Sequence, residues 1–354
     1  MSRYRAPGRV NLMGDHTDYN DGFVLPMAID RDCVVEASPA SDGMVRARSR
    51  ELPGQVAVAA DGRDEPRSVE PGWGRFVAGA VRVLAARGAA IEGAELEISS
   101  SVPVGSGLSS SSALSVALTL SLADLGGLSL DTIEAARLAL AAEVEATGVP
   151  GGLMDQLAAL FGQAGHALLI DCRVPTIQPV PIARDLAVIV VHCGLPRTLA
   201  DSPYATRRAE CEEIAARLGI AALRDATLDQ VADLPRARHV VTENARVLDT
   251  ADALRAGDLD ALGLLLLASH ASLRDDYEVS TPELDVLVEL LVQSGAAGAR
   301  LTGAGFGGCV VALAPRREGA DVLARAMDRY RTETGLEPTG FVARAVDGAL
   351  HPFE

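Results

Sequence analysis

The segment from Pro103 to Leu125, PVGSGLSSSSALSVALTLSLADL, carries the residues best suited to holding an anion. Gly105 and Gly107 can adopt backbone angles closed to other residues, and four serines follow them. The apolar residues after Ser112 predict a well-buried helix, and AELEISSSV before the segment predicts a strand. A strand, a glycine-rich turn and a helix N-terminus point unpaired N–H groups and the positive end of the helix dipole at one spot. This pattern indicates a phosphate site, with a triphosphate as the natural ligand.

The same composition also fits a flexible Gly/Ser connector, although a connector need not run directly into an apolar helix. The most common phosphate-binding loop carries G-x-x-x-x-G-K-[ST], in which the lysine reaches the β- and γ-phosphates. This chain has no lysine at all. A nucleotide at this loop would therefore need magnesium, arginine or the helix end to balance its charge.

A second polar cluster lies near the N-terminus, where Arg9, Asp15, His16, Asp18 and Tyr19 fall within eleven positions. Most of them belong to the loop GDHTDYNDG, which lies between two short predicted strands. Hydrogen-bonding side chains at this density cost stability unless they meet a polar ligand, and a sugar offers hydroxyls on every face. The alternative is a solvated turn with local Asx-type hydrogen bonds.

Three further residues could take part in the same chemistry. Asp155 lies in the first turn of a predicted helix, either as a carboxylate at the floor of a site or as a complement to the helix dipole. Glu143 lies on a predicted helix that ends at Gly148. Trp73 begins a helix that is predicted to end at Gly88, and it is either a core residue or a contact for an adenine edge.

The elements that must position these residues follow from hydrophobic periodicity. DCVVEAS, MVRARS and QVAVAA predict three strands between Asp32 and Ala60, and the apolar run LAVIVVHCG predicts a buried strand after Cys172. ARLTGAGFGGCVVALAP predicts two strands joined by a glycine loop, and GFVARAV predicts a last strand. The helices predicted in this second half cover 202–219, 236–255, 259–274, 281–295 and 317–334. The change of composition places a domain boundary near residue 172.

The bulk composition excludes several classes of protein. A length of 354 residues fits about two domains, and 48% hydrophobic with 23% charged residues is typical of a globular protein. The formal net charge of −16 argues against a nucleic-acid partner, because phosphodiester backbones require a basic surface. The five cysteines are scattered without C-x-x-C spacing, which indicates reduced thiols rather than a zinc site or a disulfide framework. We expect no membrane association and a cytoplasmic location, because the chain lacks a long apolar run and a signal-peptide pattern.

Three separated segments resemble the signature motifs of the GHMP kinase superfamily. They are APGRVNLMGDHTDYNDGFVLPMAI, PVGSGLSSSSA and LTGAGFGGC, and the first is similar to the galactokinase signature. GGLMDQ, GQAGHALLIDCR and SPYATRRAEC add galactokinase-like matches in the order of the family. The resemblance spans nearly the whole chain.

This resemblance implies an α+β, two-domain GHMP kinase fold with the active site between the domains. The N-terminal domain, residues 1–172, would hold a mixed sheet, the nucleotide loop and the sugar site. The C-terminal domain, residues 173–354, would be ferredoxin-like. The implied reaction is transfer of the γ-phosphoryl group of ATP to the anomeric hydroxyl of D-galactose, giving α-D-galactose 1-phosphate with Mg²⁺ as the metal.

The resemblance also implies individual roles. By position, Asp155 resembles the catalytic aspartate that accepts the anomeric hydroxyl proton, and Arg9 resembles the partner that keeps it ionised and oriented. Ser111 and Glu143 match the magnesium-binding pair. The positions that match sugar-binding residues are Asp15, His16, Asp18, Gly152 and Tyr204. The expected nucleotide contacts are Gly105, Ser106, Gly107, Leu108, Ser109, Ser110, Ser111, Ser112 and Trp73.

One departure leaves the acceptor open. Galactokinases usually carry Glu where this chain has Asp15, at a position that contacts the far end of the sugar near its sixth carbon. A shorter carboxylate leaves room there, so a second hypothesis is a 1-kinase for a sugar altered at or beyond C6, as in secondary metabolism. A third hypothesis is a non-catalytic sensor of galactose and ATP, although intact Arg9, Glu143 and Asp155 argue against it. We expect small-molecule partners only, and a monomer or a weak homodimer.

Overall fold

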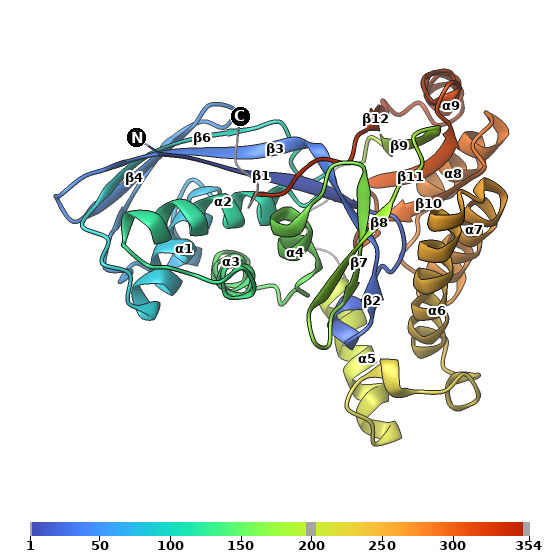
Figure 1. Cartoon of the computed structure of the whole chain (residues 1–354), viewed down its shortest axis with the longest axis horizontal. Coiled ribbons are helices and arrows are strands. Elements are labelled where there is room, and N and C mark those ends of the chain that lie inside the picture. Colours follow the sequence, from blue (N-terminus) through green and yellow to red (C-terminus); the bar gives the residue numbers. More distant parts are fainter. Residues whose placement is uncertain (1, 196–202, 350–354) are drawn as a thin grey trace.

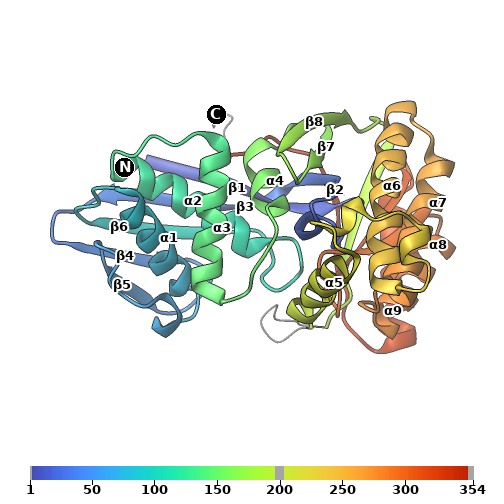
Figure 2. The same cartoon turned by 90° about the horizontal axis from the view of Figure 1, so that it is seen from below.

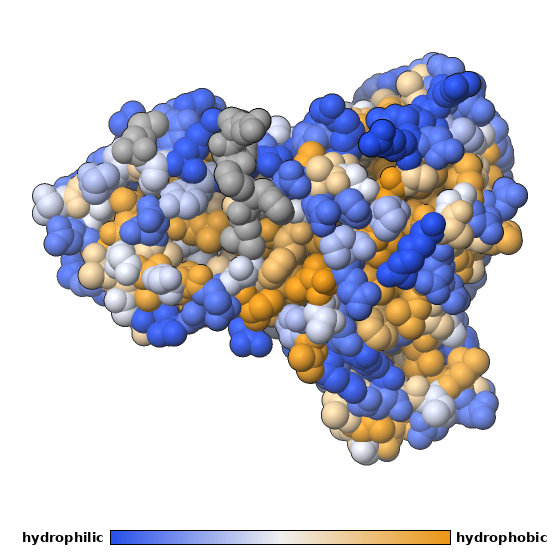
Figure 3. All heavy atoms as spheres, in the orientation of Figure 1, coloured by the Kyte–Doolittle hydropathy of each residue, from blue (hydrophilic) through white to orange (hydrophobic). Residues whose placement is uncertain are grey.

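The computed structural model describes residues 2–195 and 203–349. These residues form two lobes, each built on one large sheet, with a small third sheet where the lobes meet (Figure 1). The outline of the molecule is hollowed between the lobe that carries α1 and α3 and the projecting part that carries α5 (Figure 3). The expected two-domain α+β architecture is confirmed.

The N-terminal lobe is a five-stranded sheet covered on one face by helices (Figures 1 and 2). In spatial order its strands are β1 (Ser2–Asn11), β3 (Pro26–Pro39), β6 (Ala94–Ser100), β4 (Met44–Ser49) and β5 (Gln55–Ala59). β4 runs parallel to β6 whereas the other neighbours are antiparallel, so the sheet is mixed, as predicted. The helices are α1 (Gly74–Arg87), α2 (Ser110–Leu125), α3 (Thr132–Thr147) and α4 (Met154–Phe161).

The C-terminal lobe has the predicted ferredoxin-like topology. Its sheet has the order β10 (Gly298–Thr302), β11 (Cys309–Pro315), β9 (Leu186–His192), β12 (Thr339–Ala343), and every neighbouring pair is antiparallel. The four strands follow a βαββαβ order in the sequence, with α9 (Gly319–Thr334) as the second crossover. The first crossover is expanded to α5 (Tyr204–Leu218), α6 (Pro235–Ala256), α7 (Leu259–Asp275) and α8 (Pro282–Gln293).

The small sheet consists of β2 (Phe23–Val24), β7 (His166–Asp171) and β8 (Thr176–Pro181). The boundary predicted near residue 172 falls in the turn between β7 and β8, which pair antiparallel along their whole length. The chain enters the C-terminal sheet only at β9. The division at 172 therefore stays a prediction, and the pairing favours a position between β8 and β9.

Local sequence chemistry explains where the helices end and only partly where the strands begin. Gly88 and Gly148 close α1 and α3 in the left-handed conformation, as their positions predicted. β1 and β3 are longer than the short predicted strands, because they pair with each other from Ser2 to Asn11. Residue 202, the first of the helix predicted over 202–219, lies outside the described residues.

Residues 344–349, the C-terminal strap, return from the C-terminal lobe to the N-terminal lobe. Ala345 forms a bridge with Ile29 on β3, and the N–H of Val346 donates to the carbonyl of Ala28 at 3.1 Å. The N–H groups of Gly348 and Ala349 donate to carbonyls at the end of α4, at 2.8 and 2.9 Å. The strap therefore links the C-terminal lobe to β3 and to α4, the helix that carries Asp155.

All five cysteines are free thiols, and four of them are buried. Within residues 2–195 and 203–349, no helix is both long and apolar enough to cross a bilayer.

The packing of α1 on α3 depends on one glycine. A Cβ at Gly79 would lie 2.4 Å from the carbonyl oxygen of Ala142, which is backbone and cannot move aside. We expect Gly79→Ala to lower the free energy of unfolding by about 1–3 kcal/mol through overpacking, measured by urea denaturation. Gly72→Ala, where the added Cβ meets nothing closer than 3.9 Å, is the matched control. Equal stability of the two variants would contradict this account of the helix pair.

Candidate active site

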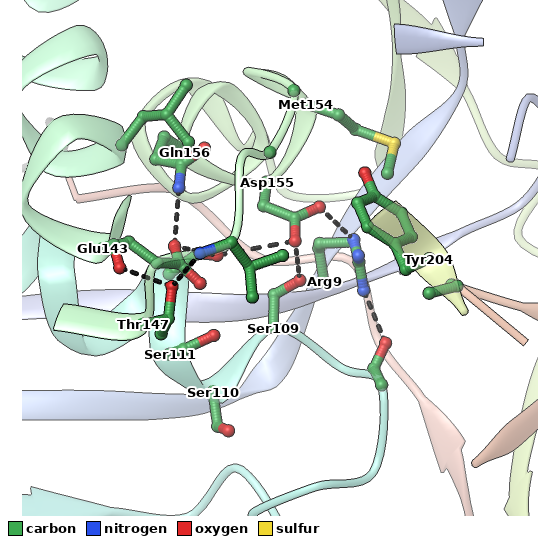
Figure 4. A pocket seen from close by; sticks show the side chains of 18 of the residues that line it. Arg9, Ser109, Ser110, Ser111, Glu143, Thr147, Met154, Asp155, Gln156 and Tyr204 are labelled. Atoms are coloured by element: carbon green, nitrogen blue, oxygen red, sulfur yellow. Dashed lines mark hydrogen bonds and ion pairs between the residues drawn. The ribbon is translucent and has the colours of Figure 1, made fainter. Parts of the chain in front are cut away.

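A cavity of about 390 Å³ collects most of the residues that the sequence singled out. Its lining comes from the loop after β1, the glycine–serine loop, helices α1 to α4, the start of α5 and the loop after β10. Figure 4 shows Arg9, Asp155, Ser109 and Glu143 facing one another across it. The three separated motifs therefore meet at a single site. The predicted residues that line it are Arg9, Asp15, His16, Asp18, Gly105, Gly107, Ser109, Ser110, Ser111, Ser112, Glu143, Gly152, Asp155 and Tyr204.

Asp155 is held by two donors at the N-terminal turn of α4. The Nε of Arg9 donates to Oδ1 at 2.7 Å, and the hydroxyl of Ser109 donates to Oδ2 at 2.5 Å. The hydroxyl of Ser112 lies 3.4 Å from Oδ2 but has a single proton, and its shorter contact is with Glu143. The side chain keeps 24% exposure, so one side of the carboxylate still faces the cavity. A carboxylate fixed in this way can orient a hydroxyl group and take up its proton.

A bulge in β1 aims Arg9 at this carboxylate. The register of β1 against β3 shifts between Pro7 and Arg9, and a Cβ at the intervening Gly8 would lie 2.7 Å from the carbonyl oxygen of Leu108. The glycine therefore lets the phosphate loop lie against the strand, where the N–H of Arg9 donates to that carbonyl at 3.1 Å. The guanidinium also donates to the carbonyl of Gly107 at 2.6 Å. Arg9 thus connects the strand, the loop and Asp155.

The glycine–serine loop ends at a helix N-terminus, as predicted. Ser109 precedes α2 in the left-handed conformation, with φ of 60°, which is uncommon for a residue with a side chain. The cavity lining includes Gly105, Gly107 and the four serines 109–112, but not Ser106 or Leu108, which lie inside the loop. The hydroxyl of Ser106 donates to the carbonyl of Pro103 at 2.7 Å, and Leu108 is buried in the core.

Glu143 lies beside Asp155 on α3 and is surrounded by donors. Its Oε2 accepts from the hydroxyl of Ser112 at 2.9 Å and from the amide of Gln156 at 2.8 Å, and the hydroxyl of Ser111 also bonds to this carboxylate. Burial raises the pKa of Glu143, and the hydrogen bond from Ser111 only partly offsets this effect. A cation near Glu143 would therefore be favoured.

The loop that follows β1 places polar groups at the other end of the cavity. Burial, together with the charge of Asp155, raises the pKa of Asp18 to about 7. A Cβ at Gly152 would lie 1.8 Å from an oxygen of Asp18, so this glycine provides the space for the carboxylate. His16 adopts φ of 67°, and its ring lies 5.8 Å from that of Tyr204. The predicted sugar residues are therefore together, and Gly152 contributes through its lack of a side chain.

Asp15 is the most enclosed of these residues. Its Oδ1 accepts from the amide of Asn11 and the N–H of Gly303, both at 3.1 Å, and its Oδ2 accepts from Arg300. Arg300 is fully buried on β10 and also donates to the carbonyl of Leu12 at 3.0 Å. The short carboxylate is thus drawn toward the C-terminal lobe.

Trp73 does not line the cavity. Its indole N–H donates instead to the carbonyl of Pro53 at 3.1 Å. Phe76, one turn further along α1, faces the cavity instead, together with Leu140 and Val149. A contact between Trp73 and adenine stays a prediction. Phe76 is the aromatic residue of α1 that lines the cavity.

Sequence reasoning also missed polar residues that complete the site. Gln156 directly follows Asp155 in the GGLMDQ match, yet only the structure shows that its amide orients Glu143. Its Oε1 is buried and has no hydrogen-bond partner among residues 2–195 and 203–349. Arg300 precedes the LTGAGFGGC motif by one residue, and a buried arginine inside an apolar strand is not readable from periodicity.

Three family models match the chain. Residues 2–39 match the galactokinase galactose-binding signature, residues 75–163 match the GHMP kinases N terminal domain, and residues 250–331 match the GHMP kinases C terminal model.

Relatives of known name match over nearly the full length. Galactokinases of Roseiflexus sp. and Haemophilus influenzae are 46% and 43% identical over 97% of this chain, covering 91% and 93% of their own lengths. The crystal structure of Lactococcus lactis galactokinase complexed with galactose superposes with a TM-score of 0.91 at 34% identity, covering 98% of this chain and 94% of that one. A mevalonate kinase structure with a TM-score of 0.70 and 19% identity, covering 98% of this chain and 100% of that one, shares the fold.

The two-lobed fold and the glycine–serine loop beside the Arg9–Asp155 pair define a GHMP kinase. Within that superfamily the chain belongs to the galactokinase family, because relatives of that name are more than 40% identical over almost all of it. It is a phosphotransferase that uses ATP and acts on a sugar hydroxyl.

The raised pKa of Asp18 gives a test of the sugar end of the cavity. Its value of about 7 lies above the ordinary 3.8, so the folded protein binds the extra proton between roughly pH 4 and 7 and loses stability as the pH rises through that window. We expect Asp18→Asn to raise the melting temperature more at pH 8 than at pH 5, because most of the stability that Asp18 costs is lost between these two pH values. It should also weaken sugar binding roughly 10- to 100-fold at pH 8, because a hydrogen bond to a charged acceptor is lost.

Asp252→Asn, at a carboxylate that is 78% exposed, is the control and should change neither quantity. Calorimetric melting at the two pH values and sugar titration at pH 8 decide the matter. An Asp18→Asn protein with unchanged sugar affinity would remove Asp18 from the binding site.

Proposed function

We propose that this chain transfers the γ-phosphoryl group of ATP to the anomeric hydroxyl of D-galactose, giving α-D-galactose 1-phosphate and ADP. The observation that carries the proposal is the position of Asp155. It lies between the glycine–serine loop and the polar loop after β1, with Arg9 and Ser109 each donating to one of its two oxygens. Family membership supports galactose as the acceptor.

In the proposed reaction, Asp155 orients the anomeric hydroxyl toward the γ-phosphorus. The anomeric oxygen forms a bond to phosphorus, the bond between phosphorus and the β,γ-bridging oxygen breaks, and ADP leaves with that electron pair. The hydroxyl proton passes to Asp155 as the new bond forms. Arg9 balances the negative charge that gathers between the two ligands. Phosphoryl transfer depends mainly on such positioning and charge stabilisation.

Mg²⁺ fits the residues beside this carboxylate. Ser111 and Glu143 supply hard oxygen ligands, and the burial that raises the pKa of Glu143 favours a cation there. No cluster of three or more His, Cys, Asp or Glu side chains suited to a metal occurs in the described part of the chain. Magnesium commonly takes one or two carboxylates and completes its shell with phosphates and water. When bound, Mg²⁺ would be held by Ser111 and Glu143 and would neutralise negative charge on the phosphates.

The surroundings of Asp15 favour a second candidate acceptor. Both oxygens of this carboxylate accept hydrogen bonds from the protein, from Asn11, Gly303 and Arg300. It is therefore less available to a C6 hydroxyl than the usual longer glutamate would be. A sugar altered at or beyond C6 is the alternative that follows. Cytoplasmic location, and a monomer or weak homodimer as the oligomeric state, also stay predictions.

A panel of free sugars tests the acceptor. Purified protein with MgATP is assayed for ADP release on D-galactose, 6-deoxygalactose and chain-extended analogues, and phosphorus NMR assigns the phosphorylated carbon. We expect the highest kcat/KM with galactose and phosphate on C1. A much higher value with an analogue would select the second candidate. Binding of both ligands without turnover on any sugar would instead identify a sensor.

Asp155→Asn tests the role of the carboxylate. The amide keeps the shape but cannot accept the proton or balance Arg9, so we expect kcat to fall by about 10²- to 10⁴-fold. Both KM values should change much less, because the cavity is intact. Glu145→Gln, on the outer side of α3, is the matched control with 42% of its side chain exposed. A loss of kcat below about tenfold would contradict both a proton-accepting and an orienting role.

A further inference from the structure

Helix α6 contacts residues 14–23, the sugar-binding loop, through side chains that do not line the cavity. Three of its side chains, His239, Glu243 and Asn244, lie on one face of the helix and are buried. The spacing of four residues puts His239 and Glu243 on the same side of the helix, and Asn244 follows Glu243 directly, about 100° further round the helix axis. Such polar residues break the apolar pattern expected of a buried helix face, and the phosphoryl-transfer mechanism uses none of them.

All three side chains bond to the backbone of the loop. The N–H of Gly14 donates to Oε1 of Glu243 at 3.0 Å, and the N–H of Phe23 donates to Oδ1 of Asn244 at 2.8 Å. Nε2 of His239 lies 3.2 Å from the carbonyl oxygen of Asp15. The helix thus holds both ends of the segment 14–23, which carries Asp15, His16 and Asp18.

The glycines of the loop explain how it comes so close to the helix. A Cβ at Gly14 would lie 2.8 Å from Val247, and a Cβ at Gly22 would lie 2.5 Å from Oδ1 of Asn244. Side chains at either position would push the loop away from α6. The loop is therefore shaped to fit this helix, not only to fit a ligand.

Glu243 is the central residue of the contact. It is fully buried and accepts from three groups, the N–H of Gly14, the hydroxyl of Ser269 at 2.7 Å and the Nε of Arg246 at 2.7 Å. Only a carboxylate can accept from three donors with both oxygens. Burial alone would raise the pKa of Glu243, but the positive charges of Arg246 and Arg300 outweigh it and lower the pKa to about 2. The residue is therefore ionised at any working pH.

His239 completes the arrangement as a neutral donor. Burial lowers its pKa to about 4, so at neutral pH one ring nitrogen carries a proton and the other accepts. Nε2 faces a carbonyl and must donate, and Nδ1 then accepts from the hydroxyl of Ser272 at 2.9 Å. Asp15 is fixed on its other side by Arg300. Both its backbone and its side chain are thus held by the C-terminal lobe.

We propose that the face of α6 formed by His239, Glu243 and Asn244 positions the sugar-binding loop, with Glu243 as the residue on which sugar affinity depends. This inference rests on the proposed function, since it assigns the loop to the acceptor. None of the three side chains lines the cavity, so they act through the loop backbone as positioning residues. The nucleotide contacts lie on other elements, so ATP affinity should not depend on this face.

The test compares the effect of each variant on the KM for galactose with its effect on the KM for ATP. Glu243→Met removes the acceptor of the Gly14 N–H and keeps much of the volume, and we expect it to raise the KM for galactose at least tenfold with the KM for ATP within twofold. Glu243→Gln retains one acceptor oxygen for Gly14 and should recover at least half of that loss on a logarithmic scale. Leu248→Ala, on the exposed side of α6 with 40% exposure, is the control and should change neither KM.

Galactose titration by calorimetry, together with melting curves, separates positioning from general destabilisation. A folded Glu243→Met protein whose galactose KM stays within twofold of the wild type would overturn the inference. So would an equal rise of both KM values. If Glu243→Met fails to fold, Asn244→Ala decides, because it frees only the Phe23 N–H. We expect it to raise the galactose KM about three- to tenfold with the ATP KM unchanged, and no change would overturn the inference.

A wrong assignment of the acceptor sugar gives a different result from a wrong assignment of the positioning role. If the wild-type protein phosphorylates another sugar of the panel in preference to galactose, the acceptor assignment is wrong, and the same variants are then measured with that sugar. The positioning role is rejected only by unchanged affinity for whichever sugar the wild-type protein accepts.

Discussion

A buried guanidinium is costly unless carboxylate and carbonyl oxygens surround it, and this constraint organises the site around Arg9. Its side chain is only 7% exposed, and it reaches Asp155 on α4 and the carbonyl of Gly107 in the phosphate loop. The strand, the helix and the loop must come together to satisfy that one charge. The same contacts place a carboxylate beside the N-terminus of α2. The contacts that pair the buried guanidinium of Arg9 are therefore the same contacts that bring the strand, the helix and the loop together at the site.

Buried charges are also paired across the two lobes, at the end of the cavity that is proposed to bind the sugar. Asp15 from the N-terminal lobe is paired with Arg300 of β10, and Glu243 of α6 is paired with Arg246 while it holds the loop that carries Asp15. These buried charges leave few alternative arrangements for the loop, because each displaced partner would remain unpaired in the interior. The proposed acceptor site therefore depends on residues of both lobes, whereas the glycine–serine loop belongs to the N-terminal lobe alone.

The sequence was sufficient where chemistry is local. Glycines at the ends of α1 and α3, the strand before the glycine–serine loop and the position of Asp155 in the first turn of α4 could all be predicted. The meeting of Arg9 with Asp155, 146 positions away, followed only from resemblance to a family, because periodicity carries no long-range distances. Gln156, Arg300 and Glu243 were missed because a polar residue in the sequence usually indicates exposure. The interior partner that makes burial of such a residue favourable can be identified only from the three-dimensional structure.

The C-terminal strap has a mechanical consequence. The chain passes between the lobes once between β8 and β9 and again after β12, where residues 344–349 attach to β3 and to the end of α4. Two chain crossings and the hydrogen bonds of the strap together restrict how far the lobes could separate. A restraint of this kind would narrow the range of relative lobe positions in which the parts of the cavity face one another. Residues 344–349 would then contribute to the alignment of the cavity, although none of them lines it.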